Sequence, residues 1–166
     1  MGLTRHIAFI GLGSNLEDPR NQLIRAFVEI GKLPDTSLIA CSSLYRSAPQ
    51  GYTDQPEFVN AVAKIGTSLT PQALLQALLQ VEHRHGRVRT FRNAPRTLDL
   101  DVLLYDDVQM HEHGLTIPHP QMHLRTFVLQ PLLEIEPDCN IPFLGSAQQA
   151  LQACHGPVLE KLADAA

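Results

Sequence analysis

The chain has 166 residues, of which 44% are hydrophobic and 18% are charged. This length fits one domain over residues 1–166, and the composition excludes a disordered chain. The net charge of −4 argues against a nucleic-acid partner, because such binding depends on a broad basic face. No run of eighteen apolar residues occurs, so we expect no membrane partner. The three cysteines are widely spaced and form no CxxC motif, which predicts reduced thiols in a cytoplasmic protein.

The order of apolar runs, helix caps and breakers predicts the elements of an α+β domain. Asp18-Pro19 and Thr70-Pro71 each precede apolar positions at helical spacing, which favours an N-cap followed by a first-turn proline. Apolar runs between and after these helices predict strands. The predicted elements are a strand at 6–12, a turn at 13–15, a helix that Gly31 ends, strands at 36–46 and 58–65 around a loop at 47–56, a helix from Pro71 to about Arg84, a loop at 88–97, a strand at 98–105, a hairpin within 108–117, a short helix at 126–134 and a peripheral helix at 146–162.

This order of elements predicts a ferredoxin-like fold. Its core reads strand, helix, strand, strand, helix, strand, the βαββαβ pattern with an antiparallel sheet and helices. A small hairpin and a C-terminal helical extension follow the core. Because this fold hosts many chemistries, the function has to be argued from particular residues.

Two aspartates in the last core strand are the most informative residues. Strand side chains alternate, so Asp99 and Asp101 point to one face, with Cα atoms about 6–7 Å apart. Their carboxylates can converge on one Mg²⁺ or bridge two ions about 3.5–4 Å apart. The alternative is an exposed polar face on an edge strand, with Arg96 as an ion-pair partner. The opposite, core-facing positions are Leu98, Leu100, Val102 and Leu104.

An arginine cluster lies immediately before the two aspartates. Five of the ten arginines in the chain lie in one stretch that begins at Arg84, and the last four of them form the cluster: Arg87, Arg89, Arg92 and Arg96. A guanidinium group is planar and binds phosphate through two hydrogen bonds. Next to a divalent metal, such a cluster can hold a polyphosphate and stabilise the charge that shifts during its transfer. The alternative is a solvated basic loop.

Other common site motifs are absent or weak. No GxxxxGK[ST] occurs, and GLGSN at 11–15 has no GxGxxG continuation, so neither a P-loop nor a dinucleotide site is predicted. The pairs His83/His85 and His111/His113 have no third ligand at a suitable spacing, so we interpret them as surface histidines rather than zinc ligands. His119, which follows a proline, can donate a hydrogen bond to a phosphate.

Six stretches together resemble one known family, the hydroxymethyl-dihydropterin pyrophosphokinases. The order of GRVR, PRTLDLD, PHP and RTFVLQPL is highly specific, and the resemblance covers about residues 7–134. The stretches are GSNL (13–16), SSLYRSAPQG (42–51), DQPEFVNAV (54–62), VEHRHGRVR (81–89), APRTLDLDVLLY (94–105) and LTIPHPQMHLRTFVLQPL (115–132).

The resemblance implies an Mg²⁺-dependent enzyme of folate biosynthesis. It would move pyrophosphate from ATP to 6-hydroxymethyl-7,8-dihydropterin, by in-line attack of the pterin hydroxyl on the β-phosphorus, with AMP leaving. Two Mg²⁺ ions would be bound with ATP by Asp99 and Asp101. Either Asp101 or a bound metal ion can account for loss of the hydroxyl proton. ATP and the pterin are therefore the expected partners, and we expect a monomer.

The resemblance also implies roles for individual residues. A flat pterin favours aromatic faces, and an asparagine amide can match donors and acceptors along its edge. The implied catalytic residues are Arg87, Arg92, Asp99 and Asp101. The implied ATP-binding residues are Glu82, Arg87, Arg89, Arg96, Leu115, Thr116, His119 and Arg125. The implied pterin-binding residues are Ser47, Ala48, Phe58, Asn60 and Phe127.

The sequence departs from the family in the arginine-rich stretch, which is predicted to close over the polyphosphate as a lid. Many members carry a tryptophan just after the residue matching Arg92, whereas this chain has Asn93. Phe91 is the neighbouring aromatic residue that can supply a stacking face. A competing hypothesis is a phosphodiesterase or nucleotidyltransferase that uses the same two aspartates. A single-strand nucleic-acid-binding module is disfavoured by the charge and by the missing aromatic motif.

Overall fold

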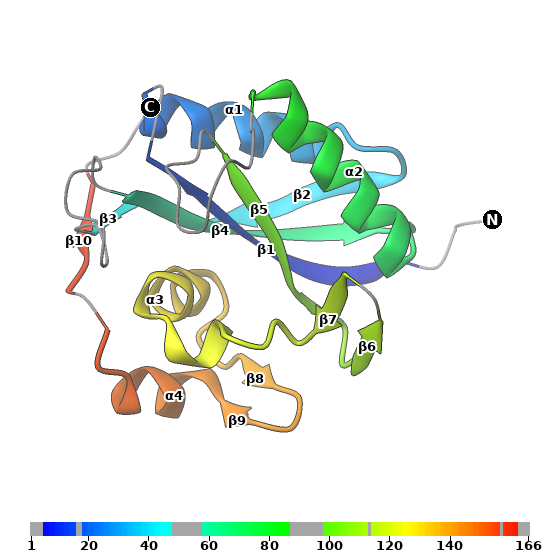
Figure 1. Ribbon diagram of the computed structural model, residues 1–166. Coiled ribbons are helices and arrows are strands. Elements are labelled where there is room, and N and C mark those ends of the chain that lie inside the picture. Colours follow the sequence, from blue (N-terminus) through cyan, green and yellow to red (C-terminus); the bar gives the residue numbers. More distant parts are fainter. Residues whose placement is uncertain are drawn as a thin grey trace.

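The computed structural model describes residues 5–15, 18–47, 58–86, 98–112, 114–156 and 158–162. A six-stranded antiparallel sheet forms its centre (Figure 1). The described elements are β1 (His6–Ser14), α1 (Pro19–Gly31), β2 (Thr36–Cys41), β3 (Tyr45–Ser47), β4 (Phe58–Thr67), α2 (Pro71–Arg84), β5 (Asp99–Tyr105), β6 (Met110–Glu112), β7 (Leu115–Ile117), the 3-10 helix η1 (Met122–Leu124), α3 (Thr126–Ile135), β8 (Asn140–Ile141), β9 (Gly145–Ser146), α4 (Ala147–Ala153) and β10 (Glu160–Lys161).

The strand order confirms the predicted ferredoxin-like fold. The sheet runs β10-β3-β4-β1-β5, and β2 also pairs with β4. The strand predicted at 36–46 is divided into β2 and β3. Ser42 explains the division: its N–H donates to Val62 O, while its Oγ accepts from Val62 N–H at 2.9 Å. A side-chain oxygen thus takes the place of a backbone carbonyl, and the regular ladder is interrupted there.

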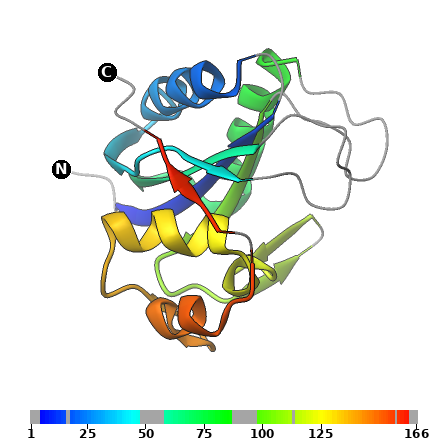
Figure 2. The same ribbon diagram turned by 90° about the vertical axis from the view of Figure 1, so that its left-hand side faces the viewer.

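Helices cover both faces of the sheet (Figures 1 and 2). On one face, α1 and α2 bury apolar residues such as Leu23 and Leu78 against β1 and β5. On the other face, α3 and α4 pack over Val62 and Leu103. Each fully buried leucine contributes roughly 1.5–3 kcal/mol to stability. None of the helices in the described ranges is long and apolar enough to cross a membrane.

The predicted helix ends are largely confirmed, with differences in detail. Thr70 caps α2, because its side chain accepts a 3.1 Å hydrogen bond from the backbone N–H of Ala73. Asp18 occupies the N-cap position of α1 but makes no side-chain capping bond, since its backbone is left-handed with φ 59°. Gly31 is the last residue of α1, and Lys32 occupies the C-cap.

The predicted helix at 146–162 is wrong over most of its length. Only Ala147–Ala153 is helical, and Glu160–Lys161 forms β10 at the edge of the sheet. Gly156 and the proline after it break the helical pattern. Beyond them, the unpaired edge of β3 supplies hydrogen-bonding partners for the chain.

Candidate active site

The two aspartates lie on β5, on the face of the sheet that α3 covers. Asp99 and Asp101 are half-buried, and Asp101 faces Gly11 of the neighbouring strand β1. Leu98, Leu100 and Val102 lie in the core under α1 and α2, as the alternation predicts. The same prediction for Leu104 is wrong. The β1–β5 register shifts so that Phe9 faces Leu104 and Ile10 faces Val102, and this bulge turns Leu104 toward α3.

A row of three paired residues joins β4, β1 and β5. Gly13 is opposite Asn60 on one side and opposite Asp99 on the other. A Cβ atom on Gly13 would lie only 2.7 Å from Asn60 Nδ2, so the glycine makes room for the amide. Asn60 Nδ2 also donates to Leu12 O at 3.4 Å. The absence of a side chain on Gly13 therefore allows the Asn60 amide to lie over β1, in the row that ends at Asp99.

Sequence reasoning missed the importance of Gly13, which it placed in a turn. The residue lies inside β1, two positions from Gly11. A glycine in the middle of a strand often marks the close approach of another group. The repeated glycine within an apolar strand was the available signal.

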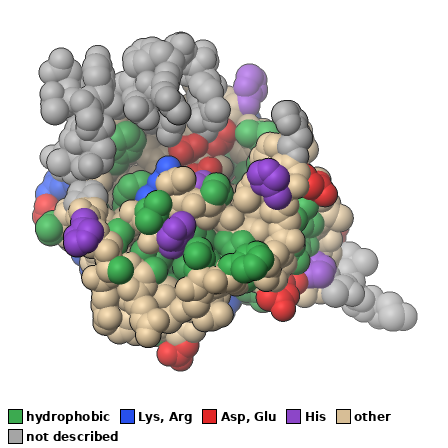
Figure 3. All heavy atoms as spheres, turned by 60° about the horizontal axis from the view of Figure 1, so that its bottom comes forward, with side chains coloured by type: hydrophobic (Ala, Val, Ile, Leu, Met, Phe, Trp, Pro, Cys, Tyr) green, Lys and Arg blue, Asp and Glu red, His purple; other side chains and the backbone are tan. Residues whose placement is uncertain are grey.

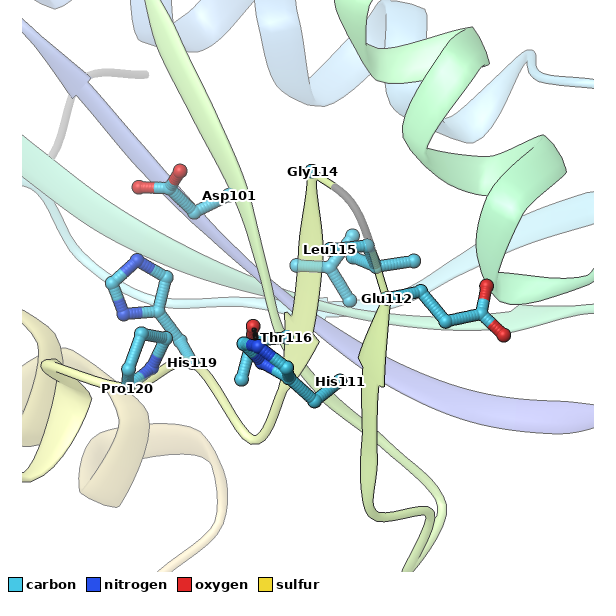
Figure 4. A pocket seen from close by; sticks show the side chains of 9 residues that line it. Asp101, His111, Glu112, Gly114, Leu115, Thr116, His119 and Pro120 are labelled. Atoms are coloured by element: carbon cyan, nitrogen blue, oxygen red, sulfur yellow. Dashed lines mark hydrogen bonds between the residues drawn. The ribbon is translucent and has the colours of Figure 1, made fainter.

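A hollow of about 630 Å³ opens beside Asp101 (Figure 4). Four of the residues predicted for the site line it: Asp101, Leu115, Thr116 and His119. His111 and Pro120 also line it. Figure 3 shows this side of the molecule, where acidic side chains gather in a hollowed area with Lys or Arg and His side chains beside them. The structure therefore brings together a carboxylate from β5 and polar groups from β7 and the segment that follows it.

His119 is held in one orientation beside β5. Its backbone N–H donates to Leu103 O at 2.9 Å, and its Nδ1 accepts from the backbone N–H of Gln121 at 3.1 Å. In the neutral ring the proton is therefore on Nε2. Burial is the main factor that lowers the pKa of His119, the charge of Arg125 lowers it further, and Asp99 opposes them. His119 thus offers a neutral N–H donor close to Asp99 and Arg125.

The predicted pterin-binding residues lie on two facing elements. Phe58 and Asn60 share one face of β4 with Val62, which packs against α3, and Ser47 of β3 pairs with Phe58. Phe127 lies on α3, and the guanidinium carbon of Arg125 is 5.5 Å from the centre of its ring. These contacts place aromatic side chains on both the sheet and the helix.

Glu82 connects helix α2 to strand β5 through a buried hydrogen bond. It is 4% exposed, and its Oε2 accepts a 2.6 Å hydrogen bond from the backbone N–H of Leu100. This bond attaches α2 to β5 next to the two aspartates. The predicted site residues Arg87, Arg89, Arg92, Arg96 and Ala48, together with Phe91 and Asn93, lie outside the described residues.

The histidine pairs are not all on the surface. His85 is buried, and its ring nitrogens contact Gln22 and Glu29 of α1. Its interpretation as a surface histidine is wrong, because the C-cap of α2 faces α1. His111 is exposed, as predicted, and its Nδ1 is 2.8 Å from Thr116 Oγ1.

The donor groups fit a metal ion that arrives with a nucleotide. Within the described ranges, no group of three or more His, Cys, Asp or Glu side chains could hold a metal ion. Mg²⁺, however, is usually bound by one or two carboxylates together with substrate phosphates and waters. Asp99 and Asp101 supply two carboxylates on one face, which is suited to such shared binding.

The fold and the site are those of a ferredoxin-like α+β protein with two carboxylates on one face of its sheet. The chain belongs to the 7,8-dihydro-6-hydroxymethylpterin-pyrophosphokinase (HPPK) family, whose model matches residues 9–137. It is 44% identical over 154 residues to the 2-amino-4-hydroxy-6-hydroxymethyldihydropteridine pyrophosphokinase of Pseudomonas aeruginosa, covering 93% of this chain and 95% of that protein. It is 50% identical over 135 residues to the enzyme of that name from Haemophilus influenzae, covering 81% and 84%.

Solved structures of similar fold come from longer chains. The wild-type HPPK-DHPS of Plasmodium falciparum, crystallised with pterin and p-hydroxybenzoate, matches with a TM-score of 0.69 at 13% identity. The match covers 91% of this chain and 43% of that one, so this chain spans less than half of the longer protein. At this identity the likeness supports the fold alone.

Proposed function

We propose that this chain transfers pyrophosphate from ATP to 6-hydroxymethyl-7,8-dihydropterin, producing AMP and the pterin diphosphate for folate biosynthesis. Family membership supports the reaction class. The observation that carries the proposal is the row Asn60, Gly13 and Asp99, which sets a pterin-compatible amide beside a metal-compatible carboxylate. The acceptor hydroxyl and the ATP phosphates can then meet above β1.

The nucleotide occupies the hollow beside Asp101 in this proposal. Asp99 and Asp101 would hold two Mg²⁺ ions, which neutralise charge on the phosphate oxygens when they are bound. Thr116 and Leu115 contact the nucleoside from β7, and His119 donates its Nε2–H to a phosphate oxygen. Beyond the described residues, Arg87, Arg89, Arg92 and Arg96 complete the phosphate contacts.

The pterin lies between β4 and the start of α3. Phe58 and Phe127 offer faces for a flat ring, and Asn60 can both donate to and accept from its edge. Ser47, which is buried at the end of β3, lies beside them, and Ala48, outside the described residues, is a further expected pterin contact. The reaction then needs mainly positioning and charge stabilisation for in-line attack on the β-phosphorus.

Product identification tests this proposal against the alternative metal enzymes. The protein is incubated with ATP, Mg²⁺ and 6-hydroxymethyl-7,8-dihydropterin, and the products are separated and identified by phosphorus NMR. We expect AMP and the pterin diphosphate in equal amounts. Free pyrophosphate, or ADP with a pterin monophosphate, would contradict the proposed transfer. A cytoplasmic location and a monomeric state stay predictions from the sequence.

A further inference from the structure

The last described residues of the chain form a strand on the edge of the sheet that carries the pterin residues. We call residues 156–162 the C-terminal strap. Within it, Glu160 pairs with Arg46 of β3, and the N–H of Leu162 donates to Leu44 O at 2.9 Å. The side chains of Glu160 and Arg46 form an ion pair across the two strands. The strap lies beyond residue 137, where the family match ends.

The strap also contacts the first residue of α3. A Cβ atom on Gly156 would lie 2.9 Å from Thr126 Oγ1 and 3.1 Å from Thr126 Cγ2, so the strap backbone is packed closely against this buried threonine. Phe127 is the next residue of α3. Figures 1 and 2 show the orange-red segment after α4 running past the start of α3 toward β3.

A carboxylate in the last turn of α3 reinforces the same connection. Glu134 accepts hydrogen bonds from Ser43 N–H at 3.0 Å, Ser43 Oγ at 2.8 Å and Tyr45 Oη at 2.6 Å. Lys161 of the strap is 3.8 Å from the same carboxylate. Burial is the largest single influence and raises the pKa of Glu134, but the hydrogen bonds from Tyr45 and Ser43 and the charge of Lys161 together outweigh it and lower the pKa. Helix α3, strand β3 and the strap are therefore joined at both ends of the helix.

From these contacts we infer that the C-terminal strap positions the two walls of the pterin pocket relative to each other. One wall is the β3–β4 pair with Ser47, Phe58 and Asn60, and the other is the start of α3 with Phe127. This inference rests on the proposed function for the identity of the ligand. The strap residues touch no reacting atom, so their role is one of positioning.

The C-terminal strap is short enough to limit the distance between β3 and the start of α3. Gly156, which lies against Thr126, and Glu160, which pairs with Arg46, are four positions apart along the chain. A fully extended chain covers at most about 3.3–3.6 Å per residue, so these two anchor points can be no more than roughly 14 Å apart. While both anchors hold, β3 cannot move far from the start of α3.

The first test uses Leu162→Pro in the full-length chain. Proline removes the N–H that donates to Leu44 O, and the variant should raise the KM for the pterin about fivefold while the KM for ATP stays within about twofold. Val158→Pro is the matched control, because Val158 is 93% exposed, and it should leave both constants unchanged. Equal increases in both KM values, or parental values in Leu162→Pro, would overturn the inference.

A second variant covers the case in which Leu162→Pro fails to fold. Gly156→Ala pushes the strap away from Thr126 and should also raise the pterin KM selectively. Thr126→Ala removes both atoms that the new methyl group meets, so the double variant should recover the parental value. Failure of this rescue would refute the positioning role. Absence of pterin-dependent AMP formation in the parent protein would instead refute the proposed function, so the two failures are distinguishable.

Discussion

Substituting Gly13 tests the row that joins the two parts of the site. The Cβ atom of Gly13→Ala would lie 2.7 Å from Asn60 Nδ2, which forces the amide to move. Overpacking of this kind costs about 1–3 kcal/mol. Replacing a strand glycine also removes chain entropy from the unfolded state, which offsets roughly 0.5–1 kcal/mol of that cost. We therefore expect the free energy of unfolding of Gly13→Ala to be about 1 kcal/mol lower than that of the parent.

Gly66→Ala is the matched control for this substitution. Gly66 lies in β4 of the same sheet, and its new Cβ would meet its nearest atoms at 3.4 Å, which is close to ordinary contact. Urea denaturation should show a neutral or slightly stabilised Gly66→Ala. The double variant Gly13→Ala with Asn60→Ala should regain the stability that the clash removes, because the two residues are coupled.

Displacement of the Asn60 amide should also weaken pterin binding. Loss of a hydrogen bond worth about 0.5–1.5 kcal/mol corresponds to a roughly 2- to 12-fold increase in the pterin KM. The Gly13–Asn60 double variant should keep this defect even though its stability recovers. If Gly13→Ala had both the stability and the pterin KM of the parent, the reasoning about this row would be refuted.

Three further predictions concern charged groups of the site and its support. Asp99→Ala and Asp101→Ala should retain the parental circular dichroism spectrum yet lose turnover, because both acids face the site; unfolded variants would count against this. Burial lowers the pKa of His119, so below about pH 6.5 the unfolded chain binds more protons than the folded one, and the free energy of unfolding decreases as the pH is lowered. In urea denaturation at several pH values, a His119→Asn variant should show a smaller decrease. An identical decrease in the variant would remove this explanation. Glu134→Gln should lower the free energy of unfolding by about 1–3 kcal/mol, because it weakens the charge-assisted hydrogen bonds from Ser43 and Tyr45. The loss should be largest above pH 4.5, where the carboxylate of the parent is ionised in both the folded and the unfolded state. Unchanged stability at pH 7 would exclude that contribution.

Local patterns predicted the elements and the acidic pair because the physical causes are local. Thr70 caps a helix through its own side chain, and alternation along β5 places Asp99 and Asp101 on one face. The order of strands and helices likewise follows from apolar spacing. These features need no knowledge of distant parts of the chain.

The missed features all depend on partners that are distant in sequence. Leu104 changes face because of a bulge opposite Phe9, and His85 is buried because α1 packs beside it. Gly13 matters because Asn60, from another strand, approaches it closely. The final strand forms because β3 has an edge without a partner, although the local pattern at 146–162 favours a helix.

Transfer to the pterin hydroxyl at the β-phosphorus of ATP is the central claim of the proposed function. The most direct measurement uses pterin labelled with ¹⁸O in its hydroxymethyl group, followed by mass spectrometry of the products. The proposal predicts that the label stays in the bridge between pterin and diphosphate and that AMP carries none. Label in AMP, or a pterin without a diphosphate, would contradict it.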